Sequence, residues 1–159
     1  EFWEVPPECL GLGVNETVLM ADPARAVEVP NRLSEAGVGL SIDDFGTGYA
    51  SLEYLKRLPV DALKIDKSFV LNMSHDAADA MIVRSTIDLA RNLGLRVVAE
   101  GIEDQSAYDM LQSLGCHLGQ GFLMSRPVSA EQLELLLDDP SWAGRTFEVG
   151  PGAEGCATG

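Results

Sequence analysis

Residues 38–65, VGLSIDDFGTGYASLEYLKRLPVDALKI, decide the fold of this chain. The stretch begins with an apolar run, Val38–Phe45, that is typical of a strand. A glycine-rich turn then leads into a helical segment, Ser51–Leu58, which Pro59 closes. A second apolar run, Val60–Ile65, predicts another strand. Two strands joined by a helix pair in parallel, so this stretch predicts one α/β unit.

The same alternation continues on both sides of this unit. Further strands are predicted at Leu10–Val14, Arg96–Ala99 and His117–Met124, and further helices at Pro23–Ala36, Asp76–Leu93, Asp104–Leu114 and Ser129–Leu137. About five strand–helix units imply a parallel sheet with helices packed outside it. We expect Asp22 to cap the helix that follows it, and Pro30 to kink or shorten that helix.

The length of the chain bounds this α/β fold. The chain has 159 residues, whereas a closed eight-unit barrel takes roughly 250. We therefore expect an incomplete barrel that forms one domain over residues 1–137. Residues 138–159 are rich in glycine, proline and small residues, which predicts a disordered tail without chemistry of its own.

Polar side chains stand where the predicted strands end. Asp43 and Asp44 end one strand, and Lys64 and Asp66 end the next. Glu100 directly follows a third strand. The carboxyl ends of parallel strands meet at one rim, and clustered carboxylates there suit divalent metal ions. The residues alone leave two interpretations open: a metal-assisted hydrolase, or a capping turn beside a structural ion pair.

The composition narrows the classes of function. The formal net charge of −14 disfavours non-specific binding to nucleic acids and acidic membranes. No apolar run approaches the 18 residues of a membrane span. The three cysteines, Cys9, Cys116 and Cys156, form no C-x-x-C pair, which favours a reducing, cytoplasmic setting over a disulfide framework or a zinc site.

Four segments together carry a resemblance to a known family. Residues 43–52, DDFGTGYASL, resemble the D-D-F-G-T-G-Y-S-S-L segment of EAL domains, the bacterial cyclic-di-GMP phosphodiesterase family. Residues 58–70, LPVDALKIDKSFV, resemble L-P-V-D-x-L-K-I-D-x-S-F-V. Residues 99–103, AEGIE, and 120–127, QGFLMSRP, are similar to A-E-G-V-E and Q-G-[YF]-x-[FM]-[SA]-[RK]-P. Their order and spacing match the C-terminal two-thirds of such a domain.

The resemblance implies a TIM-like (β/α) barrel and a hydrolytic activity. EAL domains cleave cyclic-di-GMP to linear pGpG with two Mg²⁺ or Mn²⁺ ions, a reaction that paired metals suit. By resemblance, Asp43 would bridge both ions and Asp44 would bind the second. Lys64 would contact the attacking water with Asp66 nearby, and Glu100 would assist that water.

Three more residues receive roles from the same resemblance. Glu16 and Glu103 would support the loop that follows the two aspartates. Gln120, which is flanked by glycines, would lie at the edge of the site and bind the ligand.

The chain also departs from the family pattern. It begins after the E-A-L signature, which carries a metal-binding Glu, and after the strand that carries a metal-binding Asn. Residues 12–16, LGVNE, align with L-E-[IV]-T-E, so Gly13 stands where the family has a metal-binding Glu and Asn15 replaces Thr. Losing such ligands typically costs orders of magnitude in affinity or rate. We expect weak metal binding and impaired hydrolysis.

Two classes of function therefore remain open. The chain is either part of a cyclic-di-GMP phosphodiesterase with impaired activity, or a catalytically inactive module. An inactive module would sense cyclic-di-GMP, or would bind another protein, for example as a homodimer that uses the long helix Asp76–Leu93. Gly13 favours the inactive module, whereas the aspartates and Lys64 favour a domain that still recognises cyclic-di-GMP.

Overall fold

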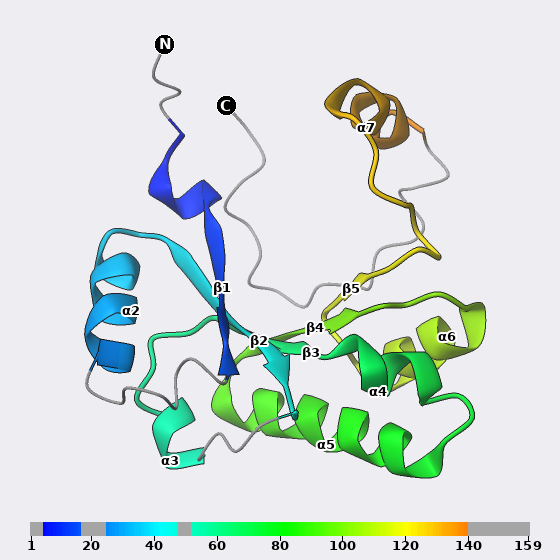
Figure 1. Ribbon diagram of the computed structural model, residues 1–159, viewed down its shortest axis with the longest axis horizontal. Helices are drawn as coiled ribbons and strands as arrows, with labels where there is room; N and C mark the ends of the chain where they lie inside the picture. The colour runs from blue at the N-terminus through cyan, green and yellow to red at the C-terminus, as the bar shows by residue number, and fades with distance from the viewer. Residues whose placement is uncertain (1–4, 17–24, 48–51, 140–159) are drawn as a thin grey trace.

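A computed structural model describes residues 5–16, 25–47 and 52–139 (Figure 1). The strands are β1 (Gly11–Asn15), β2 (Gly39–Phe45), β3 (Ala62–Ile65), β4 (Arg96–Glu100) and β5 (Leu118–Gln120). The helices are a 3₁₀ turn, η1 (Pro7–Cys9), and α2 (Arg25–Glu35), α3 (Leu52–Leu55), α4 (Lys67–Asn72), α5 (Ala77–Leu93), α6 (Gln105–Ser113) and α7 (Ala130–Leu137). The predicted alternation of strands and helices is confirmed in the described part of the chain.

The five strands form one parallel sheet in the order β1-β2-β3-β4-β5 (Figure 1). Leu63 of the central strand lies opposite Ile42 on one side and Val97 on the other. At the ends of the strands, Asn15 lies opposite Asp43. The predicted α/β class is confirmed. Among the described residues the sheet stays open, with β1 and β5 as its edges, and does not close into a barrel.

The hydrophobic core lies between the sheet and α5, which runs beneath the strands in Figure 1. Ile42, Leu63 and Val97, which are neighbours across three strands, are at most 1% exposed. α5 contributes the apolar side chains of Val83, Ile87 and Ala90 to this core. Burying one large aliphatic side chain stabilises the fold by roughly 1.5–3 kcal/mol. Because side chains alternate along a strand, the residues between these buried strand positions face the side of the sheet opposite α5.

α5 shows why its predicted bounds hold. The Asp76 carboxylate accepts a hydrogen bond from the Ala78 N–H at 2.7 Å, which satisfies an amide that the first turn leaves unpaired. Gly94 ends the helix with φ 72°, a left-handed conformation that glycine adopts without steric cost. The helix predicted over Asp76–Leu93 is therefore confirmed, with Asp76 as its cap.

Some predicted elements are shorter in the structure, and other elements were missed. β5 ends at Gln120 and does not reach Met124, because the chain turns at Gly121 and the Met124 N–H bonds back to the Gly121 carbonyl. The helix predicted over Ser51–Leu58 spans Leu52–Leu55. The sequence analysis predicted neither the 3₁₀ turn η1 nor the helix α4, which follows β3.

The expectation for Pro30 is tested only in part. α2 continues through Pro30 to Glu35, so the proline does not end the helix, and the expected kink stays a prediction. An internal proline removes a single backbone hydrogen bond, and here the rest of the helix persists around it. The predicted cap at Asp22 lies outside the described residues, as does the tail from residue 140 onward.

A histidine joins the beginnings of β4 and β5. The Nδ1 atom of His117 accepts a hydrogen bond from the Val97 N–H at 3.1 Å, which requires that nitrogen to be unprotonated. Burial lowers the pKa of His117, and the positive charges of Arg91 and Arg96 lower it further. The neutral imidazole thus acts as a structural acceptor at the end of the sheet opposite Glu100.

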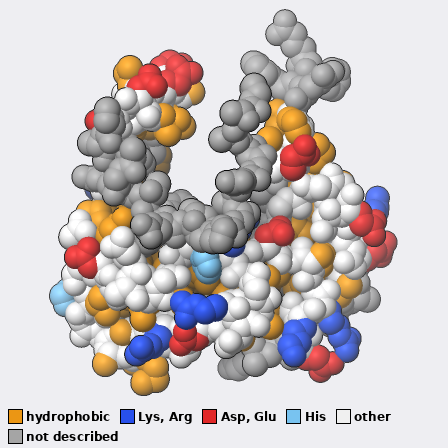
Figure 2. All heavy atoms as spheres, turned by 180° about the vertical axis from the view of Figure 1, so that it is seen from behind, with side chains coloured by type: hydrophobic (Ala, Val, Ile, Leu, Met, Phe, Trp, Pro, Cys, Tyr) orange, Lys and Arg blue, Asp and Glu red, His pale blue; other side chains and the backbone are white. Residues whose placement is uncertain are grey.

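α7 stands apart from the sheet in Figure 1 and at the upper left of Figure 2. It begins with a capping box between Ser129 and Gln132. Leu135 and Leu137 are 73% and 68% exposed, so this helix leaves much of its apolar surface uncovered. On the lower part of the face in Figure 2, acidic and basic side chains lie beside one another. Within the described ranges, no helix has the length and apolar character to cross a membrane.

Candidate functional site

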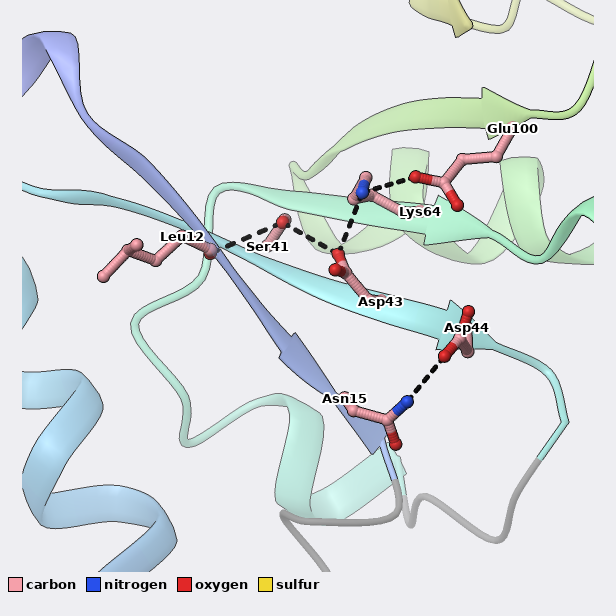
Figure 3. A network of polar contacts seen from close by, with 7 residues as sticks. All are labelled: Leu12, Asn15, Ser41, Asp43, Asp44, Lys64 and Glu100. Carbon is pink, nitrogen blue, oxygen red and sulfur yellow. Dashed lines mark hydrogen bonds and ion pairs between the residues drawn. The ribbon is translucent and has the colours of Figure 1, made fainter. Parts of the chain in front are cut away.

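Three charged side chains meet at the carboxyl ends of β2, β3 and β4 (Figure 3). Lys64 lies between Asp43 and Glu100, on the face of the sheet opposite the buried side chains of its neighbours in β3. Its Nζ atom is 3.2 Å from Oδ1 of Asp43 and forms a shorter ion pair with Oε1 of Glu100. The Lys64 side chain is 23% exposed, so the pairs are partly shielded from water. The structure thus brings together three residues that the sequence analysis selected.

Lys64 is held in its charged form. Burial alone would lower the pKa of its ammonium group, but the carboxylates of Glu100 and Asp43 outweigh burial and raise that pKa. A permanent positive charge therefore stands between two carboxylates at the rim of the sheet.

Asp44 occupies an irregularity in β2. The pairing of β2 with β3 shifts register between Ile42 and Phe45, and Asp44 has φ 55°. Few residues other than glycine adopt this left-handed conformation, and backbone strain of this kind clusters at functional sites. The Nδ2 atom of Asn15 donates a hydrogen bond to Oδ2 of Asp44 at 2.5 Å (Figure 3). The Asp44 side chain is therefore hydrogen-bonded to β1, whereas the Asp43 carboxylate is ion-paired with a residue of β3.

Asp44 and Asp66 shift each other's pKa in opposite directions. Burial raises the pKa of Asp44, and the nearby carboxylate of Asp66 raises it further. Asp66 caps α4, where its Oδ1 accepts a hydrogen bond from the Ser68 N–H at 2.8 Å. Burial opposes the ionisation of Asp66, but the Ser68 hydroxyl and amide outweigh burial and lower its pKa. The pKa of Asp44 therefore lies above that of Asp66.

The two predicted loop supports lie in different environments. Glu16 is 2% exposed, and its Oε2 accepts a hydrogen bond from the Gly46 N–H at 3.2 Å, which ties the end of β1 to the loop after β2. Glu103 is exposed and makes no hydrogen bond or ion pair with the described part of the chain. Asp104, its neighbour, caps α6. The structure thus places Glu16, but not Glu103, in contact with the loop residues that it describes.

Gln120 lies at one side of the charged cluster. It pairs with Glu100 in the register of β4 and β5, and its side chain is exposed. Beside it is a hollow of about 430 Å³ whose lining includes Phe122 and Arg126. The Arg126 guanidinium stacks over the Phe122 ring at 4.6 Å from the ring centre. Gln120, the register neighbour of Glu100, thus lines a partly apolar hollow.

Ser41 and Asn15 complete the network, although the sequence analysis gave neither a role. The Ser41 hydroxyl donates a hydrogen bond to Oδ1 of Asp43 at 3.2 Å. Ser41 lies two positions before Asp43 and therefore on the same face, which was an available signal. Asn15 reaches the site only because β1 pairs with β2, so its role depended on a register that the sequence did not reveal.

The charged cluster does not fit a two-metal centre as it is arranged. Gly13, opposite Ser41 in the register, supplies no ligand. The Lys64 ammonium occupies the position between Asp43 and Glu100. In residues 5–16, 25–47 and 52–139, no group of three or more His, Cys, Asp or Glu side chains is placed to hold a metal ion. In the described residues, the Lys64 ammonium neutralises Asp43 and Glu100.

Comparisons with known proteins agree with the motifs. Residues 3–127 match the EAL domain family. The bifunctional diguanylate cyclase/cyclic di-GMP phosphodiesterase MucR of Pseudomonas aeruginosa is 50% identical over 127 residues, which are 80% of this chain and 18% of MucR. The cyclic di-GMP phosphodiesterase PA2567 of the same organism is 41% identical over 83% of this chain and 22% of that protein. The chain thus spans about a fifth of the length of these relatives.

Solved structures show the same similarity. The MucR phosphodiesterase in complex with c-di-GMP superposes with a TM-score of 0.79 at 49% identity, over 81% of this chain and 52% of that one. Klebsiella pneumoniae BlrP1, in a manganese/cy-diGMP complex, superposes with a TM-score of 0.72 at 37% identity, over 77% of this chain and 31% of that one. The cyclic dinucleotide and the manganese belong to those proteins.

Proposed function

This chain belongs to the EAL domain family, and on that premise we propose that it is part of a domain that binds cyclic-di-GMP and hydrolyses it slowly. One observation carries the proposal: Asp43, Lys64 and Glu100, from three adjacent strands, meet in one charged cluster at the rim where α/β folds bind their ligands. The solved relatives in complex with cyclic-di-GMP support the choice of ligand.

The described residues suggest how the ligand would be held. Lys64 stays protonated and offers the positive charge that a phosphodiester requires in a chain of formal charge −14. We assign Gln120 to the edge of the ligand site, since its amide is exposed next to Glu100. The stacked pair of Phe122 and Arg126 offers a flat surface that suits a purine ring.

We attribute the slow hydrolysis to weak metal binding at the charged cluster. The family resemblance gives metal-binding roles to Asp43 and Asp44, catalytic roles to Lys64, Glu100 and Asp66, and loop-supporting roles to Glu16 and Glu103. Mg²⁺ or Mn²⁺ would bind weakly, because Gly13 removes one ligand and Lys64 competes for two carboxylates. Loss of positioned ligands typically lowers affinity or activity by at least about 10-fold.

The test compares binding with turnover in the full-length protein. Cyclic-di-GMP binding is measured by calorimetry, and formation of pGpG is measured by chromatography in the presence of Mn²⁺. We expect binding together with weak turnover, and we expect Gly13→Glu to raise turnover by about 10-fold or more. Gly13→Gln is the matched control, because it fills the same space without the charge, so the difference between the two variants measures the added carboxylate alone.

Each outcome of this test has a distinct meaning. Rapid turnover by the unmodified protein would refute the impairment. Binding without turnover in both the unmodified protein and Gly13→Glu would support the alternative function, a cyclic-di-GMP sensor. Failure to bind cyclic-di-GMP at all would refute the choice of ligand and favour a protein-interaction module.

Three further proposals concern the domain bounds, the oligomeric state and the cellular location. We propose that residues 1–137 belong to the EAL domain and that residues 138–159 form a tail, which the end of α7 at Leu137 supports. We propose a homodimer that uses α5, where Met81 is 67% exposed. Sedimentation of the full-length protein would test this association. We propose a cytoplasmic setting, which the sequence supports because its three cysteines form no C-x-x-C pair.

A further inference from the structure

Gly13 and Asp43 share one region of space. If Gly13 carried a Cβ atom, that atom would lie 2.0 Å from Oδ2 of Asp43 and 2.5 Å from its Cγ. Side-chain carbon atoms do not approach an oxygen so closely, so any other residue at position 13 would force the Asp43 carboxylate to move. The carboxylate therefore lies where the first atoms of a side chain at position 13 would otherwise be.

Two donors hold the Asp43 carboxylate over Gly13. The Ser41 hydroxyl lies 3.2 Å from Oδ1, and the Lys64 ammonium also lies 3.2 Å from Oδ1 (Figure 3). Lys64 is fixed in turn by Glu100 on its other side. Both donors satisfy the same carboxylate oxygen, so they favour the same position of the side chain.

We infer that Gly13 is a positioning residue that allows Asp43 to withdraw onto β1, where Lys64 and Ser41 hold it away from a divalent cation. This inference rests on the proposed function, because it concerns the same charged cluster. The inference goes beyond the loss of the family's metal-binding Glu at position 13, because Gly13 also changes the position of the Asp43 carboxylate.

The missing-ligand explanation and the withdrawal of Asp43 make different predictions for the metal affinity of one variant. Gly13→Ala adds a methyl group but no ligand atom. If Gly13 matters only as a missing ligand, Gly13→Ala leaves metal affinity unchanged. If Gly13 allows Asp43 to withdraw, the methyl group displaces the carboxylate toward solvent and makes it available to a cation. The obstructing atoms are the end of a flexible side chain, so the backbone of β1 can stay in place.

The experiment titrates the full-length protein with Mn²⁺ alone and measures the free ion by electron paramagnetic resonance. We expect Gly13→Ala to raise Mn²⁺ affinity by roughly three- to tenfold, the range expected for releasing one hydrogen bond and one partly exposed ion pair. Gly11→Ala is the matched control. Gly11 lies on the same strand and face, and a Cβ atom there would meet nothing within 4 Å.

A second variant guards against a folding defect in the first. Ser41→Ala removes one donor to Asp43 without changing the charge, and we expect it to raise Mn²⁺ affinity roughly twofold or more. In an Asp43→Asn background, Gly13→Ala should have no effect, because the ion-paired carboxylate is gone.

The inference is overturned if Gly13→Ala leaves Mn²⁺ affinity within twofold of the unmodified protein, or if Gly11→Ala raises it equally. A Gly13→Ala effect that persists with Asp43→Asn would also overturn it. These readouts use no nucleotide, so their failure is distinguishable from a failure to bind cyclic-di-GMP.

Discussion

Gly121→Ala is expected to destabilise the fold strongly at the turn that follows Gln120. A Cβ atom on Gly121 would lie 2.0 Å from the carbonyl oxygen of Ile102 and 2.3 Å from its nitrogen. Ordinary contacts between non-bonded heavy atoms are about 3.5 Å or longer, so the two backbone segments would have to separate by roughly 1 Å or more. Ile102 is fully buried, and its backbone cannot rotate away as a flexible side chain could.

The structure sets the magnitude of this effect. Overpacking of a close-packed region costs about 1–3 kcal/mol. Separation would also weaken two backbone hydrogen bonds: the bond from Ile102 N–H to the Gln120 carbonyl at 3.1 Å, and the bond from Leu123 N–H to the Ile102 carbonyl at 3.0 Å. Each contributes about 0.5–1.5 kcal/mol, which gives a total loss of about 2–6 kcal/mol. Such a loss is a large part of a typical unfolding free energy of 5–15 kcal/mol.

Urea unfolding of the full-length protein, followed by circular dichroism, measures the change. With a slope of about 1–3 kcal/mol per molar urea, the midpoint should fall by roughly 1 M or more. Gly11→Ala again serves as the control, because its added methyl group meets no atom within 4 Å and should change stability by less than about 0.5 kcal/mol. Equal midpoints for Gly121→Ala and the unmodified protein would refute this reasoning.

Three further predictions concern single side chains. The folded pKa of His117 lies below its unfolded value of about 6.5, so the unfolded chain takes up the proton first. The contribution of His117 to stability should be fully present above about pH 6.5 and should be lost as the pH falls from there through the folded pKa. His117→Asn keeps an acceptor for the Val97 N–H and should flatten this part of the pH–stability curve. An unchanged curve would contradict the role of the neutral imidazole as a structural acceptor. Burial raises the pKa of the Cys116 thiol to about 11, so a thiol reagent at pH 8 should modify exposed Cys9 quickly and Cys116 only after urea is added. Mass spectrometry of the labelled peptides measures the modification of each cysteine. Rapid labelling of Cys116 in the folded protein would be inconsistent with its burial. Asp76→Ala should cost about 1 kcal/mol in urea unfolding through the loss of the α5 cap, whereas Asp76→Ser should recover most of it, and equal loss in both variants would argue against a capping role.

The order of strands and helices was predictable because its signals are local. Apolar alternation, Asp76 before α5 and Gly94 after it each act within a few residues of the element that they define. The miss at α4 has a physical reason as well. Asp66 was interpreted as a site residue, whereas in the structure it also caps a helix of six residues, too short to give a periodic signal.

The candidate site was only partly predictable. Placing Asp43, Lys64 and Glu100 at strand ends followed from alternation and from the parallel fold. The left-handed conformation of Asp44 and its contact with Asn15 depend on a register shift that no local pattern records. The environments of Glu16 and Glu103 likewise differ because one is buried against a loop and the other faces solvent.

The amino-acid sequence alone determined the family, the order of the elements, the carboxylates at the strand ends and the departure at Gly13, because these depend on residue identity and spacing. Only the tertiary structure decided that Lys64 joins Asp43 to Glu100 and that the Asp43 carboxylate lies over Gly13. The reason is that ion pairs and close contacts depend on strand register and side-chain rotamers, and both are settled by residues far apart in the chain.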